Sequence, residues 1–175
     1  FLDYIDGDLD QADPAEASAR IAALVRAIRP QVVVTFAPDG SYGHPDHIAI
    51  CQYTTAALVR AADDSDPAVD GPPHRVAKFY YNVSRLEEVA HYEAAFGPMI
   101  MPVDDVPRGA VAWPEWAITT WIDATGHWRR AVEAVACHAS QIPDMATMRA
   151  LPEAEAQLLF GWQTYYRVYS LVNGG

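Results

Sequence analysis

The residues best suited to chemistry lie in one short stretch, PDGSYGHPDHIAI (38–50). Two histidines, His44 and His47, stand three positions apart, with Asp46 between them and Tyr42 just before them. Neutral imidazole is the commonest protein ligand for zinc, and a nearby carboxylate can accept an imidazole N–H and so determine which ring nitrogen is protonated. This combination of residue types predicts a functional site that handles protons or a metal ion.

The stretch lies where a strand is expected to end and a helix to begin. QVVVTF (31–36) is a continuous apolar, β-branched run, which is typical of a parallel strand covered on both faces. Apolar spacings of three and four predict helices over 14–28 and 47–62. Gly40 and Gly43 allow a tight loop between strand and helix. Because ligands bind beyond the carboxyl ends of strands in layered α/β folds, the histidines are expected at that edge of a sheet.

The rest of the chain supplies further elements of the same kind of fold. Strands are expected at 76–83 and 117–123; helices at 84–96, 125–140 and 152–171; a polar loop at 63–75; and no assignable structure at 97–116. The length of 175 residues suits one domain.

Composition excludes several classes of protein. Twelve basic residues stand against 23 acidic ones, and the net charge of −11 is spread along the chain. Nucleic acids and anionic membranes are therefore not expected as partners, because phosphate binding needs clustered Lys and Arg. No apolar run approaches the roughly 20 residues of a membrane span. Cys51 and Cys137 are expected to be buried, reduced thiols of a cytoplasmic protein.

The string G-H-P-D-H-I, preceded by D-G-S-Y, resembles the second signature of the LmbE/PIG-L family of zinc-dependent N-acetylglucosaminyl deacetylases. DYIDGDL at the start resembles the family's D-G-x-L stretch. TTWIDATGHWRRAVEAVACHASQ resembles its late strand and helix ending in H-x-S/T-Q. The resemblance implies a Rossmann-like three-layer α/β sandwich with a mainly parallel sheet. It also implies hydrolysis of the N-acetyl, or a related N-acyl, group of a glucosamine-containing small molecule or glycoside.

The resemblance assigns roles within the HPDH string. His47 would be a ligand of one Zn²⁺ ion. His44 would hydrogen-bond the developing oxyanion or protonate the leaving amine, with Asp46 tuning it. Tyr42 would lie over the scissile carbonyl and help to polarise it.

Other residues are expected around the substrate. By resemblance, Asp6 would contact a sugar hydroxyl, and His138 and Gln141 would lie close to the pocket in a supporting role. Trp113 and Trp116 stand in the unassigned segment and could stack on a sugar ring there, although aromatic residues are more often part of a core.

The earlier signature of the family, which carries most of its metal ligands, is absent from this sequence. Members of the family carry A-H-P-D-D-E after their first strand, whose His and second Asp bind zinc and whose first Asp is the general base. No such string occurs here. We therefore expect residues 1–175 to be the carboxyl-terminal part of a single deacetylase domain, seen without its N-terminal strand and helix. The missing N-terminal segment of the same protein would supply the other ligands.

Three alternatives remain open. The chain could be a non-catalytic sugar-binding homologue, or an amidase acting on glucosaminyl thiol conjugates. An α/β nucleotide-binding domain is the third, but no G-x-G-x-x-G or P-loop follows a strand. A small amino-sugar is the expected partner, and the tyrosines of QTYYRVY (163–169) are expected on the last helix, packed internally or between the subunits of a homo-oligomer.

Overall fold

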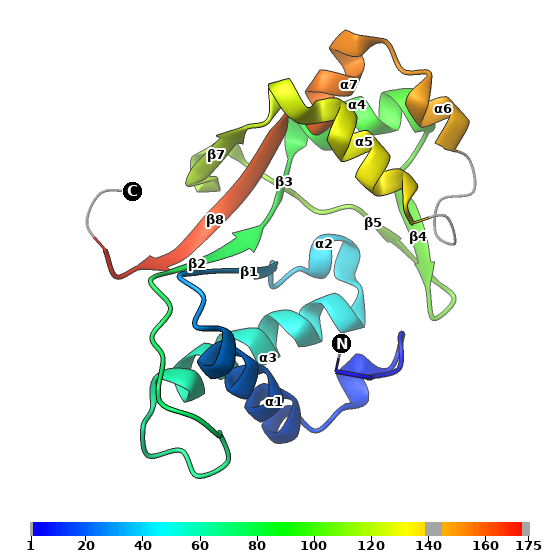
Figure 1. Cartoon of the computed structure of the whole chain (residues 1–175). Coiled ribbons are helices and arrows are strands. Elements are labelled where there is room, and N and C mark those ends of the chain that lie inside the picture. The colour runs from blue at the N-terminus through cyan, green and yellow to red at the C-terminus, as the bar shows by residue number, and fades with distance from the viewer. Residues whose placement is uncertain (1, 139–144, 173–175) are drawn as a thin grey trace.

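The computed structural model describes residues 2–138 and 145–172 of the chain. Its main sheet has four strands in the order β1, β2, β8, β7 (Figure 1). Their bounds are Val32–Phe36 for β1, Lys78–Asn82 for β2, Trp162–Ser170 for β8 and Thr120–Asp123 for β7.

The strand directions are mixed. β1 and β2 run parallel, whereas β8 runs antiparallel to both β2 and β7. The α/β fold is confirmed, but the sheet formed by the described residues is not mainly parallel. The reason is that the long strand β8 lies between β2 and β7 and pairs with both of them.

Two helices, α1 (Pro14–Ile28) and α3 (Pro45–Ala62), lie side by side against one face of the sheet (Figure 1). The Asp13 carboxylate caps α1 by accepting hydrogen bonds from the N–H groups of Ala15 and Glu16. Small side chains let the two helices and the sheet approach closely. The core between them contains Ala22, Val25, Ala57, Leu58, Ala61, Val69, Val76 and Phe79.

The opposite face of the sheet is more open. Val32 and Val34 are each 49% exposed, whereas Val33 between them packs against the core under α1 and α3. The expectation that this strand is covered on both faces is therefore wrong for the described residues. A hollow of about 230 Å³ on the open face is lined by Val32, Val34, Tyr80, Thr120, Ile122 and Tyr165.

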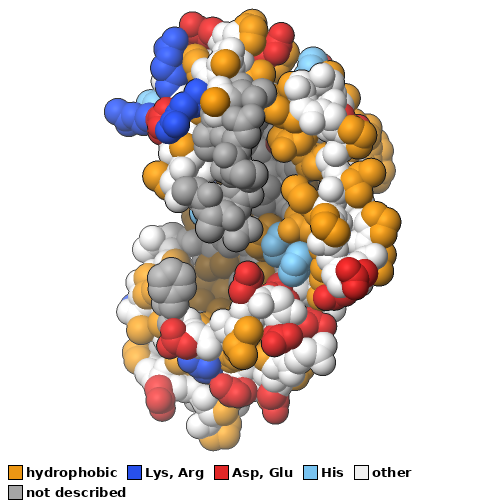
Figure 2. Space-filling view, turned by 90° about the vertical axis from the view of Figure 1, so that its right-hand side faces the viewer, with side chains coloured by type: hydrophobic (Ala, Val, Ile, Leu, Met, Phe, Trp, Pro, Cys, Tyr) orange, Lys and Arg blue, Asp and Glu red, His pale blue; other side chains and the backbone are white. Residues whose placement is uncertain are grey.

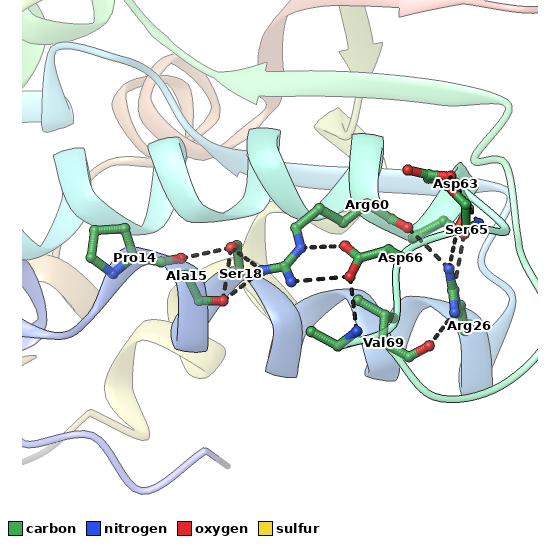
Figure 3. Close-up of polar contacts among 11 residues, drawn as sticks. Pro14, Ala15, Ser18, Arg26, Arg60, Asp63, Ser65, Asp66 and Val69 are labelled. Carbon is green, nitrogen blue, oxygen red and sulfur yellow. Dashed lines mark hydrogen bonds and ion pairs between the residues drawn. The ribbon is translucent and has the colours of Figure 1, made fainter.

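A buried arginine ties α1 to the C-terminal end of α3. Arg26 is only 4% exposed, and Figure 3 shows it reaching from α1 towards the loop after α3. All three of its guanidinium nitrogens donate to backbone carbonyls. The acceptors are those of Arg60, Ala61, Asp63, Val69 and Gly71. A cation at this end also complements the helix dipole.

A second arginine extends the same contact. Arg60 Nε lies 2.7 Å from Asp66 Oδ2, and Arg60 Nη1 donates to Ser18 Oγ at 2.9 Å (Figure 3). These bonds hold the loop at 63–75, expected from its polar residues, against both helices.

The expected long final helix is wrong beyond residue 160. Helix α7 (Glu153–Phe160) ends at Gly161, where a Cβ would lie 2.4 Å from the Gln157 carbonyl oxygen. The aromatic run that follows forms β8, since it can pair with strands on both sides. The tyrosines of QTYYRVY therefore stand on a strand, and their pairing between subunits stays a prediction.

The segment that had no expected structure forms a hairpin. β4 (Ile100–Val103) pairs antiparallel with β5 (Val106–Gly109). Asp104 and Asp105 between them have φ of 52° and 62°, as a two-residue hairpin turn of type I′ requires. A short strand β6 (Ala112–Trp113) follows and pairs with β3 (Ser84–Arg85).

A group of helices gathers near one end of β8 (Figure 1). They are α4 (Leu86–Phe96), α5 (Trp128–Ala136) and α6 (Met145–Arg149), together with α7. The expected helices at 84–96 and 125–140 correspond to α4 and α5. Cys51 is buried as expected, but Cys137 after α5 is exposed, and both are free thiols. Among the described residues, no helix combines the length and the apolar character that crossing a membrane requires.

Candidate active site

The loop between β1 and α3 is short and tightly folded. The turn α2 (Gly40–Gly43) begins at Asp39, whose Oδ1 accepts from Ser41 N at 2.8 Å. Gly40 and Gly43 have φ of 66° and 74°, and a Cβ at Gly40 would lie 2.8 Å from Ile48 Cγ1. Ser41 also has a positive φ, 66°, without being glycine. Such a conformation costs on the order of 1 kcal/mol and persists only where neighbouring groups enforce it.

This loop brings three of the predicted residues together. The His44 and His47 rings stack with centroids 4.7 Å apart, and His47 also stacks on Phe36 at 3.9 Å. The ring of Tyr42 stands edge-on to both, at 5.7 Å from His44 and 5.2 Å from His47. The predicted cluster of two imidazoles and a phenol is therefore present at the carboxyl end of β1.

Backbone contacts determine which nitrogen of each neutral ring carries the proton. His47 Nδ1 lies 3.1 Å from the Gly40 carbonyl oxygen, so this nitrogen must donate and Nε2 keeps its lone pair. His44 Nδ1 instead accepts from the N–H of Asp46 at 3.1 Å, so the proton of the neutral ring sits on Nε2. One ring thus offers a lone pair, suited to a metal ion, and the other offers an N–H donor.

The surroundings also affect the charge of these groups. Burial is the largest influence on His47 and lowers the pKa of its ring, which favours the neutral form that a metal ion requires. Burial, followed by the negative charge of Asp6, raises the pKa of Tyr42 and keeps its phenol protonated. The exposed Asp6 therefore lies within electrostatic reach of Tyr42, and its contact with a sugar hydroxyl stays a prediction.

The Asp46 carboxylate contacts the N-terminal segment, and the expected tuning of His44 by this residue stays a prediction. Its buried carboxylate accepts from the backbone N–H of Gly7 at 2.8 Å and of Leu9 at 3.1 Å. No hydrogen bond between this carboxylate and His44 or His47 occurs among the described residues. Asp46 instead anchors the N-terminal segment that carries Asp6, because both its oxygens are occupied there.

Trp113 reaches the same loop from a distant part of the chain. Its indole Nε1 donates to Asp39 Oδ2 at 2.7 Å, and its ring packs on Tyr166 with centroids 5.5 Å apart. Arg108 of β5 donates from Nη1 to the Gly43 carbonyl oxygen at 2.7 Å. Arg108 was missed by sequence reasoning, because the hairpin carrying it had no assigned structure. Trp116 is 87% exposed.

The other expected residues are not drawn into this cluster. His138 is exposed after the end of α5, and no described contact joins it to the two histidines. Gln141 lies outside the described residues.

A metal ion would find one suitable ligand in this cluster. His47 presents a free Nε2, held in place by the Gly40 carbonyl and by Phe36. No group of three or more His, Cys, Asp or Glu side chains among the described residues could hold an ion. A catalytic zinc usually has about three protein ligands, so the cluster fits part of such a site.

Open space adjoins the loop that carries the cluster, on the side of Gly43 and Pro45. A cavity of about 330 Å³ adjoins the loop and is lined by Asp10, Gly43, Pro45, Ile48, Ala49, Gln52, Tyr53 and Arg108. Figure 2 shows histidine side chains beside a deep hollow, with acidic side chains nearby. A small polar molecule can therefore approach this end of the sheet.

Known proteins resemble this chain in sequence and fold. Residues 1–58, which include Asp6 and the HPDH string, match the family model "PIG-L: GlcNAc-PI de-N-acetylase". A protein of Kineococcus radiotolerans, named 1D-myo-inositol 2-acetamido-2-deoxy-alpha-D-glucopyranoside deacetylase, is 36% identical over 180 residues, covering 95% of this chain and 48% of the relative. A protein of the same name from Thermobifida fusca is 38% identical over 153 residues, covering 84% and 51%. The chain thus spans about half the length of these curated relatives.

A solved structure shares the fold. The conserved protein TT1542 from Thermus thermophilus superposes with a TM-score of 0.62 over 98% of this chain and 66% of that one, at 18% sequence identity. The agreement confirms the expected Rossmann-like arrangement of sheet and helices.

Proposed function

The chain belongs to the PIG-L family, and on this premise we propose that its site serves the hydrolytic removal of an N-acetyl group from a glucosamine-containing small molecule. The names of the relatives favour a glucosamine linked to inositol as the substrate class. The observation that carries the proposal is that the two stacked neutral imidazoles are protonated on different ring nitrogens, Nε2 in His44 and Nδ1 in His47. A metal-dependent amide hydrolase needs both a metal ligand and a hydrogen-bond donor near the scissile carbonyl, and His47 and His44 could supply this pair.

The proposed cofactor is one Zn²⁺ ion bound by Nε2 of His47. The other ligands would come from a segment outside these 175 residues that carries a string like A-H-P-D-D-E. Zinc, when bound, lowers the pKa of a coordinated water to about 7 and polarises a carbonyl. The lowered pKa of His47 suits this role, since only the neutral ring coordinates a metal.

The residues of this chain would act on the two ends of the scissile amide. His44 Nε2–H would donate to the acetamide oxygen as negative charge develops there, whereas protonation of the departing amine would require the ring to be an imidazolium at that step. The Tyr42 phenol, kept protonated by its raised pKa, would donate to the same carbonyl. The Asp6 carboxylate would accept a hydrogen bond from a sugar hydroxyl. Asp46 would hold the segment that carries Asp6 in place.

A cytoplasmic location is part of the proposal. Both cysteines are free, and Cys137 is exposed, which fits a reducing compartment.

The test is an assay of the full-length protein loaded with Zn²⁺. We expect N-acetylglucosaminyl inositol to release acetate and a free amine in equal amounts, with activity lost in a chelator and restored by added zinc. Faster hydrolysis of a glucosaminyl thiol conjugate would favour the amidase alternative. Saturable sugar binding with no acetate released would favour the non-catalytic homologue and overturn the proposal.

A further inference from the structure

Residues 108–113 contact the loop 39–43 at three points. Arg108 Nη1 donates to the Gly43 carbonyl at 2.7 Å, Val111 N donates to the Ser41 carbonyl at 2.6 Å, and Trp113 Nε1 donates to Asp39 Oδ2 at 2.7 Å. The three acceptors belong to every second residue of the loop, namely Asp39, Ser41 and Gly43. They are 65 to 74 residues away in sequence from Arg108 and Trp113, so this is a tertiary contact and not a local turn.

The contact adds donors from outside to the hydrogen bonds that the loop makes within itself. Within the loop, Asp39 accepts from Ser41 N and from Gly43 N, which satisfies two donors. The positive φ of Ser41 is unfavourable for a side chain, so groups outside the turn must help to hold it. Val111 and Arg108 do so by donating to the carbonyls of Ser41 and Gly43.

The segment that supplies these donors is itself fixed to the rest of the molecule. β6, which contains Trp113, pairs with β3, and the Trp113 ring packs on Tyr166 of the long strand β8. Arg108 stands on the β4–β5 hairpin, and its Nε is buried without a hydrogen-bond partner in the described residues. The guanidinium is thus held against the loop although not all of its donors are used there.

We propose that Arg108 and Trp113 are positioning residues for the proposed active site, which hold the loop 39–43 so that Tyr42 and His44 face the substrate. Gly43 is joined directly to His44, so a shift of its carbonyl moves the imidazole that would donate to the oxyanion. Ser41 and Gly43 flank Tyr42 in the same way. The position of His47 depends less on this contact, because its ring stacks on Phe36 of β1.

This division predicts which properties change. Loss of the contact should lower kcat, since a misplacement of about 1 Å can cost on the order of 10²-fold in rate. Zinc content should stay the same, because His47 keeps its place. KM should change little, because the Arg108 guanidinium and the Trp113 indole N–H are engaged with the loop, and the indole ring packs on Tyr166. A large rise in KM for Trp113→Phe alone would instead indicate that the indole stacks on the sugar.

The experiment uses the full-length, zinc-loaded protein with the variants Arg108→Met, Arg108→Lys and Trp113→Phe. Hydrogen exchange of the backbone amides at 41–44 is followed by mass spectrometry, together with kcat, KM and zinc content. We expect Arg108→Met and Trp113→Phe to speed exchange of these amides about tenfold or more, while amides of α1 are unchanged. Arg108→Lys should restore most of the protection, because an ammonium group can still donate to the Gly43 carbonyl.

Arg129→Met serves as the matched control for Arg108→Met, because it changes an exposed arginine on α5 that pairs with Glu153. It should match the wild type in exchange and in kcat.

The outcomes separate this inference from the proposed function on which its kinetic part rests. Unchanged exchange at 41–44 in both Arg108→Met and Trp113→Phe would overturn the positioning role, even if activity fell. Faster exchange throughout the protein would also overturn it, because that result indicates general destabilisation. If the wild type released no acetate, the proposed function would fail, and local exchange would still decide whether the contact holds the loop.

Discussion

The two ends of helix α3 each carry a cluster of polar side chains, and the clusters use their hydrogen-bonding groups differently. At the C-terminal end, every guanidinium nitrogen of Arg26 donates to a backbone carbonyl, and Arg60 pairs with Asp66 and Ser18. At the N-terminal end, His44 and His47 each use Nδ1 in a backbone contact, and Nε2 of each ring has no such contact within residues 2–138 and 145–172.

This difference separates a structural cluster from a chemical one on the same helix. A cation whose donors are all satisfied in a buried position stabilises the fold and has nothing left to offer a ligand. An imidazole with one nitrogen fixed has a defined orientation and a second nitrogen available for a metal ion or a substrate. Substitutions at the C-terminal end should therefore lower mainly the stability of the protein, and substitutions at the N-terminal end should lower mainly its activity.

The largest effect is expected for His47→Ala. Removal of the ring takes away the proposed zinc ligand, so both bound zinc and acetate release should be lost while the protein stays folded. Metal analysis of the purified variant measures its zinc content, and thermal unfolding shows whether it stays folded. His127→Ala, at an exposed position, is the control and should keep its zinc. Full zinc content in His47→Ala would show that this ring is not a ligand.

His44→Ala should keep zinc and lose rate. Loss of one donor to a developing oxyanion typically lowers kcat by about 10²–10³-fold. Steady-state kinetics with zinc analysis of the same sample makes the measurement. A variant that lost zinc as well as rate would contradict the division of roles between the two histidines.

Arg26→Met should lower the stability of the protein and leave its catalytic rate unchanged. Several carbonyls would lose their donor at once, and each unpaired buried group costs about 1–3 kcal/mol, so we expect the free energy of unfolding to fall by about 3 kcal/mol. The kcat of the folded fraction should stay unchanged. Urea unfolding compared with the exposed Arg130→Met control provides the test. Equal stability of the two variants would mean that the Arg26 contacts contribute little.

The smallest effect is expected for Asp66→Asn, and it should depend on pH. The hydrogen bond from Arg60 is the main cause that lowers the pKa of the Asp66 carboxyl below its unfolded value of about 3.9. A lowered folded pKa stabilises the protein above the unfolded pKa, and this contribution disappears as pH falls through the folded pKa. The variant should therefore melt slightly below the wild type near pH 7, and the gap should shrink as pH falls below the unfolded pKa and through the lowered folded pKa of Asp66. A gap of unchanged size across this pH range would rule out the ion pair as its cause.

The parts that sequence reasoning predicted well depend on neighbours along the chain. Helix α1 begins at Pro14 after the Asp13 cap, and the cluster of Tyr42, His44 and His47 sits after β1 as expected. These features follow from capping groups, apolar periodicity and glycines within a few residues of one another.

The parts that were wrong or missed depend on distant partners. Residues 162–170 form a strand because β2 and β7 flank them, although their apolar residues also suit a helix. Asp46 binds Gly7, which is 39 residues away, and Trp113 binds Asp39, which is 74 residues away. The paired aspartates at 104 and 105 were a local signal for the hairpin, and they were not recognised as a turn.

The sequence by itself determined which chemical groups gather at the start of α3, because a strand, two glycines and a helix cap within about a dozen residues place them there. The tertiary structure decided how those groups are used. It brought Arg108 and Trp113 to the loop and gave the Asp46 carboxylate to the N-terminal segment. Such contacts join parts of the chain that only folding brings together, and no local pattern of residues records them.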